Sequence, residues 1–272
     1  MNPMLNIAIR AARAAGDDII KNLPKVPDLK VNEKARNDFV SYVDLSAEEK
    51  IVEILLKAYP DHSILAEESG KHEGNDYRWI IDPLDGTANY LHGFPQYAVS
   101  IALQYKGRLE VGVVYDPYKQ ELFAASRGDG ATLNDRRIRV TPKTSTRDAL
   151  LGTGFPFRNR QLLGVHNKML CSFFDTAADI RRAGSAALDL AYVAAGRLDG
   201  YWEVALQPWD IAAGALIVRE AGGIVGDIHG QDNFLKTGHI VTGNPRIFAD
   251  MIRKIKPYVS EVDSLYPSKI SD

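Results

Sequence analysis

The feature that most constrains the fold is a run of strand-like segments in the middle of the chain. Between residues 63 and 140, stretches rich in branched and aromatic side chains are separated by turns that contain glycine, proline or aspartate. These stretches are SILAEE, YRWIIDPLD, YAVSIALQY, RLEVGVVYD and QELFAAS. The pattern predicts a large, mostly antiparallel sheet.

Two helices are expected before this sheet. Apolar residues recur every three or four positions between Leu5 and Ile19, which is typical of an amphipathic helix. A loop is expected over 31–44. A second helix is expected from Ser46, because Ser46 and Glu49 have the spacing of a capping box. Helices followed by a sheet indicate a mixed α and β fold.

After residue 142, short strands and helices alternate. Strands are expected at 149–155, 198–204 and 239–244, and helices at about 160–174, 184–195, 209–223 and 245–256. Neither an internal repeat nor a linker rich in glycine or serine separates 1–142 from 143–272. We therefore expect both parts to pack into a single domain that spans 1–272.

Composition excludes several classes of protein. The 272 residues carry 33 Lys and Arg against 35 Asp and Glu, and a net charge of −2 argues against a protein that mainly binds nucleic-acid phosphates. The one cysteine excludes an intrachain disulfide and a cysteine-based zinc site. The charged, amphipathic N-terminus does not resemble a signal peptide, and no apolar run approaches the roughly 20 residues of a membrane span. We expect a soluble cytoplasmic protein without a membrane partner or direct nucleic-acid binding.

Several common catalytic motifs are absent from the sequence. No two histidines have the helical spacing of an HExxH metal site, and neither a phosphate-binding P-loop nor a GxGxxG pattern follows a strand. The GxSxG turn of serine hydrolases is also missing. These absences weaken the nucleotide-binding and serine-nucleophile interpretations.

The segment that ends at Thr87 carries the strongest chemical signal. An apolar strand runs directly into Asp82 and Asp85, and Gly86 permits a sharp turn. Hard divalent cations such as Mg²⁺ favour carboxylate oxygens and substrate phosphate. Two such cations about 3.5–4 Å apart need a shared carboxylate, for which Asp82 is the natural candidate. The N–H groups of Gly86 and Thr87 would face an anion. An ordinary Asp-Gly turn is the alternative interpretation.

Further acidic residues stand at the ends of predicted elements. Glu67 and Glu68 end an apolar strand, and at most one of them can face the same site because consecutive strand residues point to opposite faces. Asp210 stands at a helix start, where aspartate is often only a cap, and the same holds for Asp44. Taken singly, each of these acids is also explained by a solvated strand end or a helix cap.

Together, these residues resemble the paired signatures of the inositol monophosphatase family. The first signature is the run from Asp82 to Thr87, and the second is Trp209-Asp210 with the downstream stretch from Glu220 to Gly223. The resemblance extends over essentially the whole chain, through the acidic motif Glu67-Glu68-Ser69 and the N-terminal stretch from Asn37 to Asp44. The stretch Arg181 to Leu190 is similar to the bacterial SuhB-type branch of this family in particular.

The resemblance implies a layered α/β/α/β/α sugar-phosphatase fold of the α+β class. It also implies Mg²⁺-dependent hydrolysis of phosphomonoesters such as myo-inositol 1-phosphate, with two to three cations in each active site and inhibition by Li⁺. The implied metal ligands are Glu67, Asp82, the Leu84 carbonyl, Asp85 and Asp210. The implied catalytic residues are Asp44 and Thr87, which would orient and deprotonate water, together with Glu67.

The resemblance also implies a set of substrate contacts. Phosphate would rest on Gly86 and Thr87, and the polyol would meet residues from the second half of the chain. The implied contacts are Asp85, Gly86, Thr87, Gly184, Ser185, Ala186, Glu203 and Asp210, and Arg181 is added as a basic side chain beside them. One residue departs from the family pattern, because Ala88 stands where a second threonine is usual.

Two alternative functions remain open at this point. One is a phosphatase for another small phosphomonoester, such as a nucleotide 3′-phosphate or fructose 1,6-bisphosphate. The other is a binding role, because SuhB-type proteins are associated with ribosomal RNA antitermination and contact RNA polymerase or Nus factors. Arg181-Arg182 and the run Arg136 to Arg139 are candidate contact residues, although an ordinary solvated surface explains them too. The family typically forms homodimers, which is the expected oligomeric state.

Overall fold

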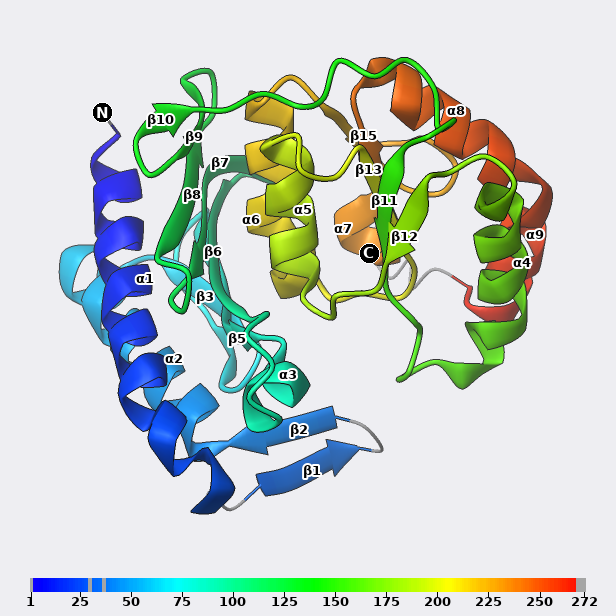
Figure 1. Cartoon of the computed structure of the whole chain (residues 1–272). Helices are drawn as coiled ribbons and strands as arrows, with labels where there is room; N and C mark the ends of the chain where they lie inside the picture. Colours follow the sequence, from blue (N-terminus) through cyan, green and yellow to red (C-terminus); the bar gives the residue numbers. More distant parts are fainter. Residues whose placement is uncertain (1, 29–30, 36–37, 268–272) are drawn as a thin grey trace.

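The computed structural model describes residues 2–28, 31–35 and 38–267. Its helices and strands form successive layers of helices, sheet, helices, sheet and helices (Figure 1). This arrangement confirms the predicted α+β class and the α/β/α/β/α order of layers. The helices are α1 (Pro3–Asn22), α2 (Tyr42–Ala58), α3 (Thr87–Leu91), α4 (Leu163–Phe174), α5 (Ala186–Ala194), α6 (Pro208–Glu220), α7 (Phe234–Thr237), α8 (Pro245–Ile255) and α9 (Val259–Leu265), with 3-10 turns η1 (Leu23–Asp28), η2 (Arg160–Leu162) and η3 (Lys256–Tyr258).

The larger sheet has eight strands in the order β10-β9-β8-β7-β6-β5-β3-β4. Its strands are β3 (Ser63–Ala66), β4 (Gly70–His72), β5 (Tyr77–Asp85), β6 (Ala98–Tyr105), β7 (Arg108–Asp116), β8 (Glu121–Ser126), β9 (Gly130–Leu133) and β10 (Arg136–Arg137). The pairing of β3 with β5 is parallel and the other described pairings are antiparallel. The predicted large, mostly antiparallel sheet is therefore confirmed, and all five predicted segments contribute a strand to it.

The smaller sheet has five strands in the order β12-β11-β13-β15-β14. Its strands are β11 (Leu150–Thr153), β12 (Asp179–Arg181), β13 (Gly200–Glu203), β14 (Ile224–Gly226) and β15 (Ile240–Gly243). Sequence patterning identified β11, β13 and β15 but not the three-residue edge strands β12 and β14. These edge strands are too short to show a period of two in the sequence.

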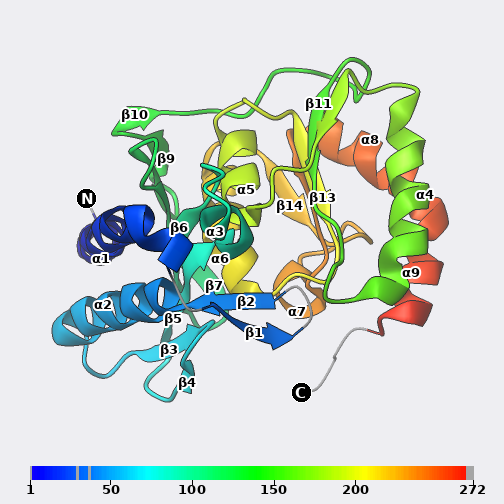
Figure 2. The ribbon, with the colours of Figure 1, turned by 60° about the horizontal axis from the view of Figure 1, so that its bottom comes forward.

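The alternation of side chains along each strand divides the interior into three apolar cores. Trp79 and Ile81 of β5 face α1 and α2, which lie side by side on the outer face of the large sheet (Figures 1 and 2). Ile80, between them in sequence, belongs to the central core with α5 and α6. In the smaller sheet, Tyr201 faces this central core, whereas Trp202 packs toward α4 and α8. Both sheets are thus covered on both faces, and β5 and β13 end beside the central helices.

Two expectations about the N-terminal part are wrong. The stretch 31–44 is not a loop, because it contains the paired strands β1 (Val31–Ala35) and β2 (Asp38–Ser41) and the start of α2. Helix α2 begins at Tyr42, four residues before the predicted start. Ser46 lies inside the helix, and its hydroxyl donates a hydrogen bond to Asp18 of α1 at 2.7 Å instead of capping the helix. The hydrogen bond from Ser46 of α2 to Asp18 of α1 thus takes the place of the capping interaction that the spacing of Ser46 and Glu49 predicted.

Gly112 of β7 lies at a close approach of the large sheet to α6. A Cβ atom at this position would lie 2.7 Å from the backbone oxygen of Ala213. We expect Gly112→Ala to lower the free energy of unfolding by about 1–3 kcal/mol, because neither backbone can yield without repacking the central core. Thermal or urea unfolding measures the effect. Gly164→Ala is the control, since its exposed Cβ would meet no atom within 4 Å, and equal losses in both variants would contradict the packing argument.

No helix among residues 2–28, 31–35 and 38–267 combines the length and the apolar character that crossing a membrane requires.

Candidate active site

A cavity of about 380 Å³ opens where several layers end together. Its walls come from the ends of β3 and β5, from α3, from the segment 153–159 after β11, and from the residues that begin α5 and α6. The acidic residues on its walls are Glu67, Asp82, Asp85, Asp189, Glu203 and Asp210. Residues separated by more than a hundred positions in sequence therefore share one pocket.

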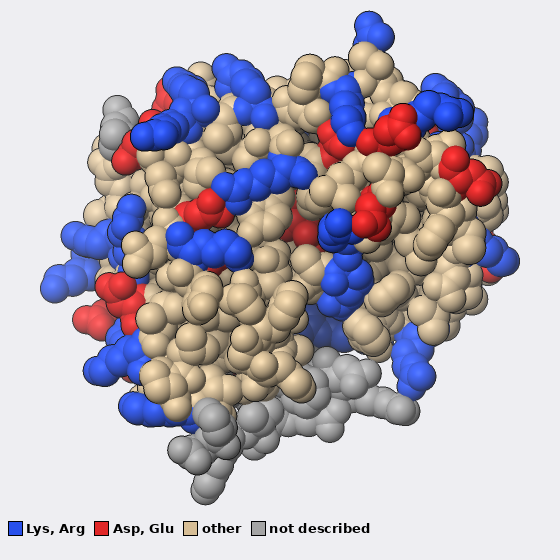
Figure 3. All heavy atoms as spheres, in the orientation of Figure 1, with Lys and Arg blue, Asp and Glu red and all other residues tan. Residues whose placement is uncertain are grey.

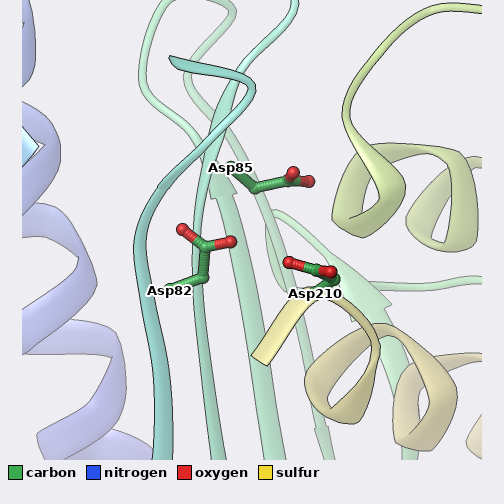
Figure 4. Close-up of side chains that lie close together, drawn as sticks. All are labelled: Asp82, Asp85 and Asp210. Carbon is green, nitrogen blue, oxygen red and sulfur yellow. The ribbon is translucent and has the colours of Figure 1, made fainter. Parts of the chain in front are cut away.

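Three aspartates converge within this pocket. Asp82 and Asp85 come from the end of β5 and Asp210 from the first turn of α6, and their carboxylates point toward one another (Figure 4). One oxygen from each of the three lies within 4.8 Å of the others. Asp82 is 1% exposed, and its Oδ1 accepts a hydrogen bond from the Leu84 N–H at 3.0 Å. The capping position predicted for Asp210 is also observed, because its Oδ2 accepts from the Gln207 N–H at 2.7 Å.

Crowding makes these carboxylates hard to ionise. Burial raises the pKa of Asp82 well above its usual range, and the charges of Glu67, Asp85 and Asp210 raise it further. Burial raises the pKa of Asp85 to about 7, even though Ser185 and the Ala187 N–H donate hydrogen bonds to its Oδ2, each at 2.7 Å. Like charges in a dry site oppose one another, so a bound cation would relieve a repulsion that the fold itself creates.

Thr87 and Asp44 form a hydrogen-bonded pair at one side of the pocket. The Thr87 hydroxyl lies 2.8 Å from Asp44 Oδ1 and 3.0 Å from the Leu84 carbonyl oxygen. A hydroxyl has a single proton, so it donates to one of these acceptors at a time. Asp44 is 1% exposed and stands behind Thr87, away from the pocket wall. The hydrogen bond to Thr87 therefore links Asp44 to the pocket.

Backbone close approaches shape the pocket between the two halves of the chain. Gly86 has a φ of 96°, and a Cβ there would lie 2.8 Å from the Gln96 carbonyl oxygen and 3.3 Å from that of Gly184. Glycine is required at this turn for both reasons. Ser185 is the N-cap of α5, close to the helix start expected at residue 184. Gly86, Thr87, Gly184, Ser185 and Ala186 all line the pocket.

Glu203 lines the same pocket as Gly86 and Thr87. Tyr201 donates a hydrogen bond to Glu203 Oε2 from within the central core. Burial raises the pKa of Glu203 to about 7, and the Tyr201 hydrogen bond partly offsets that rise. Burial also raises the pKa of neighbouring Asp189 well above its usual range. Burial therefore favours the neutral, protonated forms of Glu203 and Asp189 on this wall of the pocket.

The structure places Arg182, and not Arg181, against the pocket. Arg182 lines the cavity with its guanidinium over the rings of Phe155 and Phe157, whereas Arg181 pairs with Asp179 on the same strand. Consecutive residues at a strand end point in opposite directions, so only one of the two arginines can face inward. Arg181, the arginine predicted from the sequence, is not among the described residues that line the pocket.

Sequence reasoning also missed several residues around the pocket. Asn89 of α3 donates hydrogen bonds to the Gln96 and Ala183 carbonyls at 2.7 and 2.9 Å, and thereby joins α3 to the segment before α5. Arg158 Nη2 lies 3.5 Å from Glu67 Oε1. Glu48 is the only one of these missed residues that the sequence could have indicated. It lies one helical turn after Asp44, and residues four apart share a helix face.

The donor set of the pocket fits Mg²⁺. Asp82, Asp85 and Asp210 supply carboxylate oxygens, Leu84 supplies a carbonyl oxygen nearby, and none of the described lining residues is histidine or cysteine. Hard oxygen donors suit Mg²⁺, whereas zinc and copper sites are built mainly from nitrogen and sulfur. The raised pKa of Asp82 also fits a cation site, because a cation would relieve the repulsion between the crowded carboxylates that raises it.

The layered fold and this acidic, oxygen-lined pocket define a phosphatase. A model of the inositol monophosphatase family matches residues 1–260. The chain therefore belongs to the inositol monophosphatase family, whose members use Mg²⁺.

Individual relatives resemble the chain over nearly its full length. It is 53% identical over 263 residues to the Nus factor SuhB of Pasteurella multocida, covering 96% of this chain and 98% of that protein. It is 51% identical to the Nus factor SuhB of Escherichia coli with the same coverage. Among solved structures, the inositol monophosphatase from Anabaena has a TM-score of 0.83 and 40% identity, covering 93% of this chain and 95% of that one.

Proposed function

We propose that the protein is a Mg²⁺-dependent phosphomonoesterase that hydrolyses myo-inositol 1-phosphate and similar polyol phosphates. The observation that carries this proposal is the convergence of Asp82, Asp85 and Asp210 within one buried pocket. Glu67, Asp82 and the Leu84 carbonyl would hold one cation, and Asp82, Asp85 and Asp210 a second. Bound Mg²⁺ lowers the pKa of water and polarises phosphoryl oxygens.

Thr87 and Asp44 would orient and deprotonate the attacking water. With Asp44 accepting the Thr87 proton, the Thr87 oxygen is left as an acceptor toward the pocket. A water molecule that donates to Thr87 could pass its proton through this hydroxyl toward Asp44. The burial of Asp44 fits a role as the inner member of such a pair.

Phosphate and polyol would occupy opposite walls of the pocket. Gly86 and Thr87 begin α3, whose first N–H groups have no partner within the helix and suit an anion. Gly184, Ser185, Ala186 and Glu203 would contact the polyol hydroxyls, with Asp85 and Asp210 beside them. Arg182, which lines the pocket as Arg158 also does, is a basic side chain available to the substrate. Ala88 lines the pocket without the hydroxyl that a threonine would add there.

A panel of phosphomonoesters tests this function. Purified protein with millimolar Mg²⁺ should release phosphate from myo-inositol 1-phosphate faster than from a nucleotide 3′-phosphate or fructose 1,6-bisphosphate. Faster release from the nucleotide 3′-phosphate or from fructose 1,6-bisphosphate would support the alternative function, a phosphatase for another small phosphomonoester. Absence of Mg²⁺-dependent phosphate release from every substrate would reject the enzymatic proposal.

Glu203→Ala should change substrate discrimination more than it changes catalysis. Loss of a hydrogen bond to a charged group costs about 1.5–3 kcal/mol, so kcat/KM for inositol phosphate should fall about 10- to 100-fold. An aryl phosphate without polyol hydroxyls serves as the control substrate and should lose much less. Equal losses for both substrates would contradict a polyol-binding role for Glu203.

We propose a second function, a contact with RNA polymerase or Nus factors, which could coexist with catalysis. It is supported by the identity of 50% or more to proteins named Nus factor SuhB. Lys and Arg gather in the upper half of the face in Figure 3, with Asp and Glu among them. Arg136, Arg137 and Arg139 are exposed at the edge strand β10 and just after it. Capture of RNA polymerase by an Asp82→Asn variant, but not by Arg136→Glu/Arg139→Glu, would support this contact, and no capture by either variant would reject it.

A further inference from the structure

The short turn that carries Glu67 is held by its backbone. Residues 67–69 join β3 to β4, and the Glu67 N–H donates to the Ile81 carbonyl oxygen at 3.2 Å, next to Asp82. The next two N–H groups, of Glu68 and Ser69, donate to the two carboxylate oxygens of Glu48 at 2.8 and 2.7 Å. All three amides of the turn are therefore fixed, two of them by a single side chain.

The Glu48 side chain is buried where it makes these two hydrogen bonds. It lies on α2 and is 3% exposed, so its carboxylate is withdrawn from water and depends on these donors. It stands four residues after Asp44, on the same face of the helix. Through Asp44 and Glu48, one face of α2 thus holds both Thr87 and the turn that carries Glu67.

We propose that Glu48 is a positioning residue for the cation site. It fixes the backbone of the 67–69 turn so that the Glu67 carboxylate faces Asp82. This role rests on the proposed assignment of Glu67 as a metal ligand. Groups that orient ligands without touching the metal typically change metal affinity by about 10- to 100-fold when removed.

The two N–H groups that donate to the Glu48 carboxylate determine which substitution tests the proposal. Glutamine keeps the size of Glu48 but offers one acceptor oxygen, so its NH₂ group would face one of the two backbone N–H donors. Glu48→Gln should therefore free one end of the turn with little change in volume. Glu49→Gln is a matched control, because it makes the same chemical change at the next position of α2, on an exposed side chain.

Calorimetric titration with Mg²⁺ alone, without substrate, measures the effect. Glu48→Gln should bind Mg²⁺ about 10-fold more weakly than wild type, and Glu49→Gln should bind it equally well. Thermal melting in a chelator reports separately on folding. A Glu48→Gln protein that melts at a lower temperature yet binds Mg²⁺ with wild-type affinity would show a merely structural role and overturn the proposal.

A double-mutant cycle supplies an independent readout. If Glu48 acts through Glu67, then Glu48→Gln should cause little further loss of Mg²⁺ affinity in a Glu67→Gln background. Additive losses would overturn the proposal. Should Glu48→Gln fail to fold, Glu48→Asp keeps both acceptor oxygens on a shorter side chain and is expected to bind Mg²⁺ more weakly than wild type. An affinity for Glu48→Asp equal to that of wild type would also overturn the proposal.

Failure of this inference is distinguishable from failure of the proposed function. The calorimetric comparison needs no phosphatase activity, so it remains informative if the substrate assignment is wrong. A wild-type protein that hydrolyses no phosphomonoester but binds Mg²⁺ in a Glu48-dependent way would reject the function alone. A wild-type protein that binds no Mg²⁺ would overturn both.

Discussion

Asp82→Asn is expected to lower phosphatase kcat/KM by about 10³-fold or more, the largest loss of any single substitution in the pocket. Loss of a group that only orients a ligand already costs about 10- to 100-fold, and Asp82 would serve both cations. Asp82 is 1% exposed, and one of its carboxylate oxygens lies within 4.8 Å of an oxygen of Asp85 and of Asp210. Phosphate release at saturating Mg²⁺ measures the effect.

The same substitution should act in the opposite direction on stability. Burial and the neighbouring charges raise the pKa of Asp82, which means that the folded protein resists its ionisation. A neutral amide removes that conflict, so Asp82→Asn should melt at a higher temperature than wild type when cations are absent. Asp116→Asn is the control. Asp116 is equally buried, but Lys119 pairs with it at 2.7 Å outside the pocket, so its substitution should lower the melting temperature and spare activity.

An Asp82→Asn enzyme with near-wild-type activity would show that the shared-ligand assignment is wrong. A lower melting temperature in Asp82→Asn than in wild type, measured in chelator, would show that the acidic pocket is not a source of instability.

The second large effect concerns the pH dependence of stability. The pKa values of Asp85 and Glu203 are raised to about 7 in the folded protein, and that of Asp82 is raised as well. An acid with a raised folded pKa favours folding most when protonated. Its stabilising contribution is complete below the unfolded value of about 4 and is lost as pH rises through about 7.

We therefore expect the cation-free protein to lose stability between about pH 4 and about pH 7, by up to about 1.4 kcal/mol per pH unit for each group. Mg²⁺ binds the deprotonated oxygens, so the rise in melting temperature on adding it should grow over the same range. Melting in chelator and in excess Mg²⁺ at several pH values measures both trends. A Mg²⁺-induced shift that stays constant with pH would contradict the expectation.

Much of the pocket could be predicted from local sequence. Asp82 and Asp85 follow an apolar strand and precede Gly86, and this pattern alone indicated where a strand would deliver two carboxylates. Asp210 was found in the same way, at the start of an apolar helix that begins with proline. These signals are local, because a strand end or a helix start is defined by neighbouring residues.

The errors occurred where a distant contact competes with a local pattern. Ser46 has the spacing of a capping residue, but its hydroxyl bonds to Asp18 on another helix. Arg181 and Arg182 are equivalent as sequence, and only the course of the chain after β12 turns Arg182 toward the pocket. Neither outcome could be deduced from spacing, because each depends on which element packs beside it.

The sequence by itself determined the class of fold, the acids at the ends of β5 and at the start of α6, and their preference for a hard cation, because periodicity and residue chemistry are local properties. The tertiary structure alone decided that Asp44 reaches the pocket through Thr87 and that Glu48 holds the turn of Glu67. Those pairings arise when α2 packs against the large sheet, and the partner of a buried side chain is set by packing between layers rather than by its neighbours in the chain.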